Sequence, residues 1–166
     1  MTTGCWRLLA LAAALLATTG CGYSTDRPFS DDVQTVHVKM FHSREFRRDL
    51  EFGLTEAVAK RIEMDTPYRL APLRTADTVL AGEILEVRNR TIGDDFDTQL
   101  PRETASTLVV AYRWKDLRSG EILVERERFQ WTTHYIPPVG ESFAKGMVRG
   151  LDQMAEALVE TMETAW

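Results

Sequence analysis

Cysteine is scarce in this chain, with only Cys5 and Cys21 among 166 residues. Because Cys5 lies in a segment that we expect to be removed on export, the mature chain keeps one cysteine and cannot form an internal disulfide. Positive charge is also in deficit, since 20 Lys and Arg residues stand against 25 Asp and Glu residues, for a net charge of −5. This balance argues against nucleic acid as a partner, because phosphates require a basic surface.

The sequence also lacks the residue patterns of an enzyme or a metal site. Its histidines fall in different expected elements without the spacing of metal ligands: His37, His42 and His134. Three aspartates crowd residues 94–97, but the stretch lacks the glycine and the final glutamate of an EF-hand loop, which favours a solvated turn. A phosphate-binding glycine loop and a nucleophile elbow are also missing. We therefore expect a binding or structural protein with no catalytic residue, metal or cofactor.

The longest apolar run covers only residues 8–17, which is shorter than the roughly 20 residues that a membrane-spanning helix needs. Arg7 precedes the run, and Thr18-Thr19-Gly20-Cys21 follows it. A short apolar run that ends in small residues and a cysteine is typical of a bacterial lipoprotein signal peptide. We expect cleavage before Cys21 and acylation of its thiol, so that several acyl chains hold the protein on a membrane. The alternative is an ordinary secretory signal in which Cys21 is incidental.

Three segments follow from this interpretation. Residues 1–20 form the signal peptide, residues 21–32 form a lipidated tether of polar residues with Gly and Pro, and residues 33–166 form a single domain. Apolar alternation predicts strands over residues 35–41, 78–92, 106–116 and 122–132, and a weaker pattern over 68–73 is broken by Pro72. Apolar residues three or four positions apart predict one helix between Asp49 and Thr66 and another over 140–163. The expected fold is α+β, a two-layer sandwich in which two helices pack on one face of a mixed four-stranded sheet.

Several segments carry a family resemblance. They are the Cys21-Gly22-Tyr23 start, VHVKMF at 36–41, LEFGLTEA at 50–57, DTVLAGEI at 77–84, YRWKDLRSGE at 112–121 and IPPVGES at 136–142. In this order and spacing they resemble the LptE-type lipopolysaccharide-assembly lipoproteins over most of the mature chain.

The resemblance implies an outer-membrane lipoprotein on the periplasmic face, with a sheet and two packed helices. It also implies two partners: a large β-barrel translocon of the LptD type, whose lumen the protein plugs, and lipopolysaccharide itself. Gly22, rather than aspartate, after the cysteine is similar to the pattern of lipoproteins sorted to the outer membrane. A rival interpretation stays open, in which the protein is a lipid-anchored accessory subunit of another envelope secretion or assembly machine.

The candidate lipopolysaccharide-binding residues are basic residues near one end of two expected strands, because arginine and lysine suit the phosphates of lipid A. They are Arg113, Lys115, Arg118, Arg126 and Arg128, with Arg88 and Arg90 as possible neighbours. The alternative is that they are solvated strand residues paired with Glu125 and Glu127.

Two aromatic residues are candidates for contact with the β-barrel partner. Alternation places Phe129 and Trp131 on the same face as Glu125 and Glu127, so they are better contact candidates than Tyr112 and Trp114, which share a face with Leu108 and Val110. Gly146 and Gly150, one helical turn apart, would let the last helix approach either a partner or its own sheet closely.

Overall fold

The computed structural model describes residues 29–44, 48–94, 101–136 and 143–163. The expected signal peptide, Cys21 and most of the tether lie outside the described residues. The two helices are α2 (Arg48–Asp65) and α3 (Phe143–Glu160). The strands are β1 (Thr35–Val38), β2 (His42–Ser43), β3 (Arg69–Leu70), β4 (Thr78–Asp94), β5 (Pro101–Asp116) and β6 (Ile122–Tyr135).

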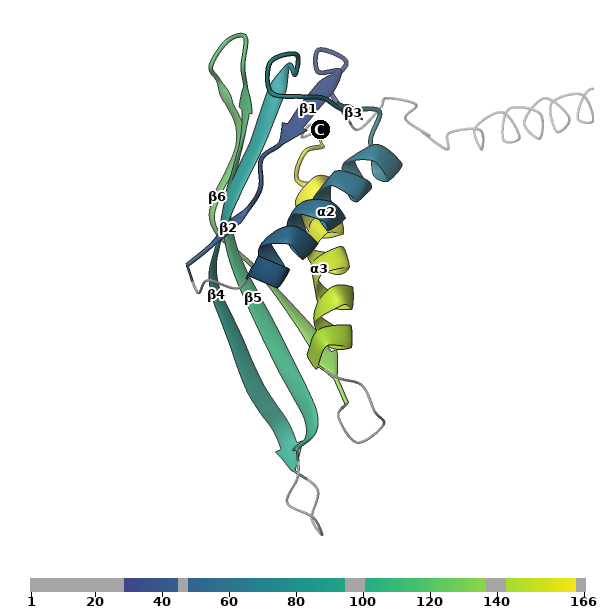
Figure 1. Ribbon diagram of the computed structural model, residues 1–166, viewed down its shortest axis with the longest axis vertical. Helices are drawn as coiled ribbons and strands as arrows, with labels where there is room; N and C mark the ends of the chain where they lie inside the picture. The colour runs from purple at the N-terminus through teal and green to yellow at the C-terminus, as the bar shows by residue number, and fades with distance from the viewer. Residues whose placement is uncertain (1–28, 45–47, 95–100, 137–142, 164–166) are drawn as a thin grey trace, which may run out of the picture.

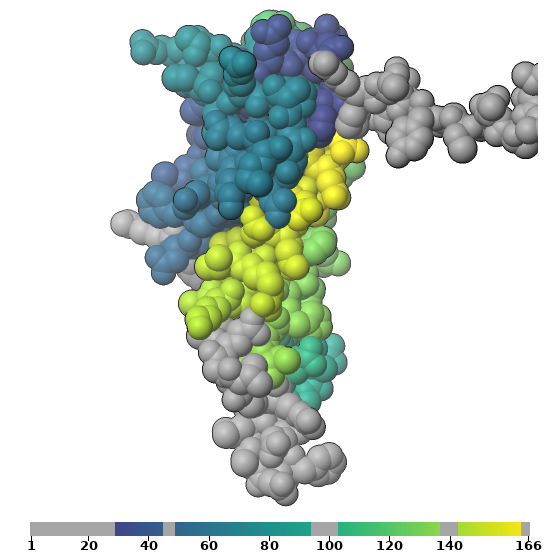
Figure 2. All heavy atoms as spheres, turned by 90° about the vertical axis from the view of Figure 1, so that its right-hand side faces the viewer, coloured from purple at the N-terminus to yellow at the C-terminus, as the bar shows by residue number. Residues whose placement is uncertain are grey.

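The strands form one mixed sheet in the order β3-β1-β4-β5-β6, and β2 pairs with β4 off this path. β1 runs parallel to β3 and β4, while β4, β5 and β6 form an antiparallel meander. Both helices lie on the same side of the sheet (Figure 1), and Figure 2 shows them side by side over that face. The α+β two-layer architecture is therefore confirmed, although the sheet has six strands rather than four.

The two additional strands are only two residues long, which explains why the sequence pattern did not separate them. β3 corresponds to part of the strand expected over 68–73. It ends two residues before Pro72, which has no backbone N–H to donate to a neighbouring strand. β2 follows Phe41 and pairs with β4 through two residues, with His42 opposite Glu83 and Ser43 opposite Ile84.

The core lies between the sheet and the helices. From α2, the expected stripe of Leu50, Leu54, Val58 and Ile62 is buried. From α3, the buried residues continue through the helix: Met147, Leu151, Met154, Ala155, Leu158 and Val159. α2 ends at Asp65, where the Thr66 hydroxyl donates to the carbonyl of Ile62 at 2.6 Å and Pro67 follows.

Close contacts at glycines fix how the layers meet. A Cβ atom on Gly82 would lie 2.2 Å from Cε1 of Phe41, so the buried Phe41 ring rests directly on the β4 backbone. On α3, a Cβ on Gly146 would lie 2.8 Å from Cβ of Tyr135, and one on Gly150 would lie 2.7 Å from Cγ2 of Thr133. The interpretation that these two glycines pack α3 on its own sheet is confirmed.

Candidate functional site

The face of the sheet opposite the helices is the candidate site, and we call it the open face. On β5 the residues of the core alternate with those of the open face, because Leu108, Val110, Tyr112 and Trp114 belong to the core. The open face therefore carries Val109, Ala111, Arg113 and Lys115 of β5. Opposite them in the ladder lie Glu83 and Glu86 of β4 and Glu125 and Gln130 of β6. Arg88 of β4 is opposite Thr107, and Arg128 of β6 lies in a bulge.

Two irregularities in the ladder shape the open face. The register shifts between Ile84 and Glu86 in β4, and β6 has two residues, Glu127 and Arg128, where β5 has only Ala111. Such bulges bend a strand and increase its twist. Beside them lies a shallow hollow of about 600 Å³. Small or apolar residues of β4 and β5 contribute to its lining, and charged residues surround them: Ala81, Leu85, Ala111, Arg44, Glu83, Arg113, Glu125 and Arg128.

Ion pairs cover much of the open face. Arg44 makes a two-pronged contact with Glu83, with nitrogen–oxygen distances of 2.9 and 3.0 Å. The hydrogen bond from Arg44 lowers the pKa of Glu83 below its ordinary value. Arg113 donates from Nε to Oε1 of Glu125 at 2.8 Å and contacts the same oxygen through Nη2. The pairing of Arg113 with Glu125 is the arrangement that the alternative interpretation predicted.

A third ion-pair group crosses β5. Glu86 of β4 lies 2.9 Å from Nε of Arg88 and 3.7 Å from Nη2 of Arg128 on β6. Because β5 lies between β4 and β6, the Glu86–Arg128 pair must pass over β5, where Val109 is opposite Glu86. Val109 is fully buried although it lies on the open face, in keeping with side chains that close over it.

The pairs leave two cations of this face available. Among the described residues, Arg90 and Lys115 have no carboxylate within ion-pair distance. The paired arginines are themselves well exposed, with 54% of the Arg88 side chain, 56% of Arg113 and 62% of Arg128 in solvent. Exposed ion pairs typically contribute only about 0–1 kcal/mol, so an incoming anion can exchange with these carboxylates at little cost.

The five basic residues expected to bind lipopolysaccharide are only partly brought together. Arg113, Lys115 and Arg128 lie on the open face together with Arg88 and Arg90. Arg126 is opposite Tyr112, and it contributes both to the lining of the hollow and to a second pocket with Thr161 and Met162 at the end of α3. Arg118 lies in the turn between β5 and β6, where Nη2 donates to the carbonyl of Asp32 at 2.8 Å.

The regular alternation assumed for Phe129 and Trp131 is wrong. The bulge at Glu127 and Arg128 returns both side chains to the core face, where they are partly buried. The ring of Phe129 lies 5.6 Å from that of Tyr112, and Nε1 of Trp131 donates to Oε1 of Gln153 in α3 at 3.3 Å. Contact of these residues with a partner stays a prediction, but the surface argument for it is lost. The run of four charged residues before Phe129 concealed the bulge, because it shows no apolar period.

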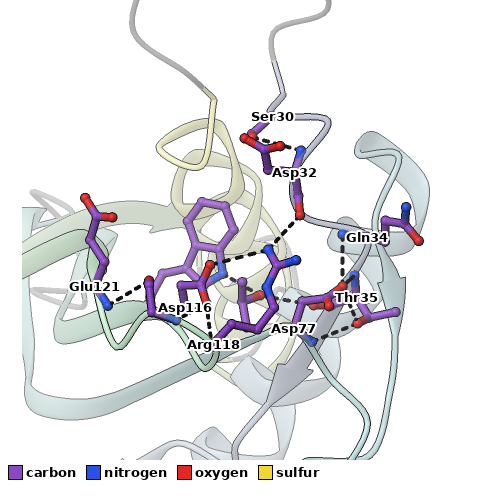
Figure 3. Close-up of polar contacts among 11 residues, drawn as sticks. Ser30, Asp32, Gln34, Thr35, Asp77, Asp116, Arg118 and Glu121 are labelled. Carbon is purple, nitrogen blue, oxygen red and sulfur yellow. Dashed lines mark hydrogen bonds and ion pairs between the residues drawn. The ribbon is translucent and has the colours of Figure 1, made fainter.

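A polar network that sequence reasoning missed closes one end of the sheet. Oδ2 of Asp77 accepts from the backbone N–H groups of Gln34 and Thr35 at 3.2 and 2.9 Å and from the Thr35 hydroxyl at 2.8 Å. These bonds, led by the Thr35 hydroxyl, lower the pKa of Asp77. Figure 3 shows Asp77 beside Thr35 and Gln34, and Arg118 reaching Asp32.

We call this part of the molecule the tether end and define it as residues 29–34, 69–77 and 115–123. Phe29 packs its ring edge-on against Tyr68 at 5.6 Å, so the last residues of the expected tether lie against the domain. Beneath the network, Nε1 of Trp114 donates to the buried Thr78 hydroxyl at 2.9 Å. Partners 42 residues apart in sequence, such as Thr35 and Asp77, leave no local signal.

Within the described ranges, no helix is long and apolar enough to cross a membrane. In the same part of the chain, no group of three or more His, Cys, Asp or Glu residues is placed to hold a metal ion.

Comparison with known proteins gives one family and several similar folds. The model of the LptE family, described as lipopolysaccharide-assembly, matches residues 33–165. A search of curated proteins found no match. Among solved structures, a hypothetical protein of Chlamydia trachomatis is 15% identical with a TM-score of 0.55, covering 77% of this chain and 96% of that one. The PelC dodecamer of Paraburkholderia phytofirmans is 15% identical with a TM-score of 0.52, covering 84% and 96%. An uncharacterized lipoprotein B of Nitrosomonas europaea is 10% identical with a TM-score of 0.52, covering 77% and 81%. At these identities the similarities show the fold alone.

Proposed function

Because the chain belongs to the LptE lipopolysaccharide-assembly family, we propose that it is an outer-membrane lipoprotein that plugs and supports a β-barrel translocon for lipopolysaccharide. The observation that carries this proposal is the extent of the family match, since residues 33–165 include all six strands and both helices. Acylation of Cys21 would anchor the protein, and the short tether would keep the domain at the periplasmic face.

The open face is the part of the domain that we propose contacts lipopolysaccharide. Its arginines are distributed along three neighbouring strands, and each has a planar guanidinium that suits phosphate oxygens. Lys115 and Arg90 lie ten positions apart along the β4–β5 ladder, so each would take a different phosphate, and Arg113 would take one by exchange with Glu125. The hollow beside them offers Ala81, Leu85 and Ala111 to apolar parts of the same ligand.

The contact is tested by charge reversal on the open face. We expect the double variant Arg113→Glu/Lys115→Glu to bind lipopolysaccharide about tenfold more weakly, equivalent to roughly 1.4 kcal/mol. Lys60→Glu is the control, because it reverses a cation of α2 that lines a pocket formed by the two helices, away from the open face. Titration of fluorescent lipopolysaccharide into each detergent-solubilised protein gives the affinities. Equal affinities for the wild type and the double variant would remove the open face from the proposal.

Translocon support is a separate part of the proposal, and it requires a stable complex with a β-barrel. The rival role, as an accessory subunit of another envelope machine, requires different companions. Identification of the proteins that accompany the chain therefore separates the two.

A further inference from the structure

Exposed apolar side chains gather at the tether end. Of the 11 large hydrophobic side chains that are exposed among the described residues, five lie there: Leu70, Leu73, Leu117, Ile122 and Leu123. Leu73 is 53% exposed and Ile122 is 45% exposed. Leu70 ends β3 and Leu73 lies in the loop after it, while Leu117 lies in the turn between β5 and β6, and Ile122 and Leu123 begin β6. The loop and the turn are joined by a 2.8 Å hydrogen bond from the Leu117 amide to the Asp77 carbonyl.

The five side chains spread across the whole width of the sheet. β3 and β6 are its two edges, four strand spacings apart in the order β3-β1-β4-β5-β6. At about 4.8 Å per spacing, the apolar end is roughly 19 Å wide. In Figure 2 the loop after β3, in teal, projects at the top of the molecule. Such a broad end with projecting leucines is suited to a flat surface rather than to a narrow ligand.

The tether enters the domain at this same end. Phe29 packs on Tyr68, and the carbonyl of Asp32 accepts from Arg118 in the turn between β5 and β6. Cys21 precedes Phe29 by eight residues. Eight residues span at most about 29 Å, so an acylated Cys21 would hold the tether end within that distance of the bilayer.

The charges of the tether end nearly balance. Its basic residues are Arg69, Arg74, Lys115 and Arg118, and its acidic residues are Asp31, Asp32, Asp77, Asp116 and Glu121. Two of the acidic groups face inward, because Asp77 accepts from Thr35, and Asp116 accepts from the amides of Arg118 and Ser119. An apolar surface without a strong charge of one sign suits zwitterionic phospholipid better than an anionic surface.

We propose that the tether end rests on the bilayer, with Leu73 and Ile122 in the headgroup region of the phospholipid leaflet that holds the acyl chains. This inference rests on the acylation of Cys21 that is part of the proposed function. Because the acylated tether keeps the domain next to the membrane, the effective concentration of lipid at the tether end is high. A contact of only a few apolar side chains is then enough to orient the domain.

Environment-sensitive labels test the contact. With Cys21 acylated, the processed chain has no other thiol, so Leu73→Cys and Ile122→Cys each take one nitrobenzoxadiazole label. Val148→Cys is the matched control, since Val148 is 69% exposed and lies on the half of α3 away from the tether end (Figure 1). Each acylated protein is placed in vesicles of phosphatidylcholine and phosphatidylethanolamine that contain doxyl-labelled lipid.

We expect lipid quenching to be at least about twofold stronger at positions 73 and 122 than at 148, with no gain when phosphatidylglycerol is added. Equal quenching at the three positions overturns the inference. Intact mass separates this result from failure of the anchor, because a chain without acyl mass refutes the anchor and the inference together. An acylated chain with equal quenching refutes only the membrane contact, and the translocon role is not involved because the vesicles hold no other protein.

Discussion

Replacement of Gly82 by alanine tests how the core is assembled around β4. The new Cβ would lie 2.2 and 2.7 Å from two ring atoms of Phe41 and 2.8 Å from the carbonyl oxygen of Ala111. Ordinary contacts at Cβ begin near 3.4 Å, so the ring must move by more than 1 Å. The Phe41 ring has no exposed surface and therefore no free space to enter. Overpacking of this kind costs about 1–3 kcal/mol and occasionally more, and complete loss of the Phe41 packing would cost about 3–5 kcal/mol.

We therefore expect Gly82→Ala to lower the free energy of unfolding by about 2–4 kcal/mol. Urea denaturation of the non-acylated Cys21→Ser protein, followed by tryptophan fluorescence, measures this loss. Gly93→Ala, on the same strand, is the control, because its Cβ would have no heavy atom within 4 Å. It should change the free energy by no more than about 0.5–1 kcal/mol, in the stabilising direction.

A double-mutant cycle identifies the clash. Phe41→Ala alone should cost about 3–5 kcal/mol, but in the Gly82→Ala background it should cost at least about 1–2 kcal/mol less, because the ring is already displaced. The Ala111 carbonyl remains close, so the rescue should be incomplete. Additive losses, or a loss for Gly82→Ala as small as that for Gly93→Ala, would refute the proposed contact between Phe41 and β4.

Three further variants test the packing of the helices and of the tether end. Gly150→Ala should lower the free energy of unfolding by about 1 kcal/mol, because the clash with Thr133 outweighs the gain in helix propensity; a rise in urea stability would contradict this. Arg61→Met should cost about 1 kcal/mol, since Arg61 of α2 lies 2.8 Å from Asp152 and 3.0 Å from Glu156 of α3. This loss should shrink in 1 M salt, and a loss independent of salt in thermal melts would argue against the ion pairs. Asp77 has a lowered pKa in the folded state, so its bonds stabilise the protein above the unfolded pKa, near 4, and that stability is lost as pH falls through the folded pKa. Asp77→Asn should therefore be less stable than wild type at pH 7, and the difference should shrink as the pH is lowered below 4 in urea melts, whereas a constant difference would contradict the assignment.

The sequence pattern was sufficient where each element buries a continuous apolar face. Leu50, Leu54, Val58 and Ile62 recur every four residues, and the structure places this face of α2 in the core of the domain. The β5 residues that alternation assigned to one face, Leu108, Val110, Tyr112 and Trp114, are likewise in the core. The α+β architecture follows from these two periods, because each face has to be covered by another layer.

The sequence pattern did not predict the two-residue strand β2 or the bulge in β6 that sets which side chains face the core. β2 is too short to show alternation, and it owes its existence to pairing with β4. The bulge at Glu127 and Arg128 reverses the direction of Phe129 and Trp131, and a run of charged residues conceals it. Of the predicted site residues, Arg113, Lys115 and Arg128 share a face, and their role in binding stays a prediction. Arg126 is opposite the core residue Tyr112, because it lies on the other side of the bulge, although it also contributes to the lining of the hollow.

The central claim is tested most directly by purification of tagged full-length protein from outer membranes in mild detergent, with identification of whatever accompanies it. The account predicts one large β-barrel protein in near-equal amount. Recovery of the chain alone, or together with subunits of a secretion machine, would contradict the translocon role.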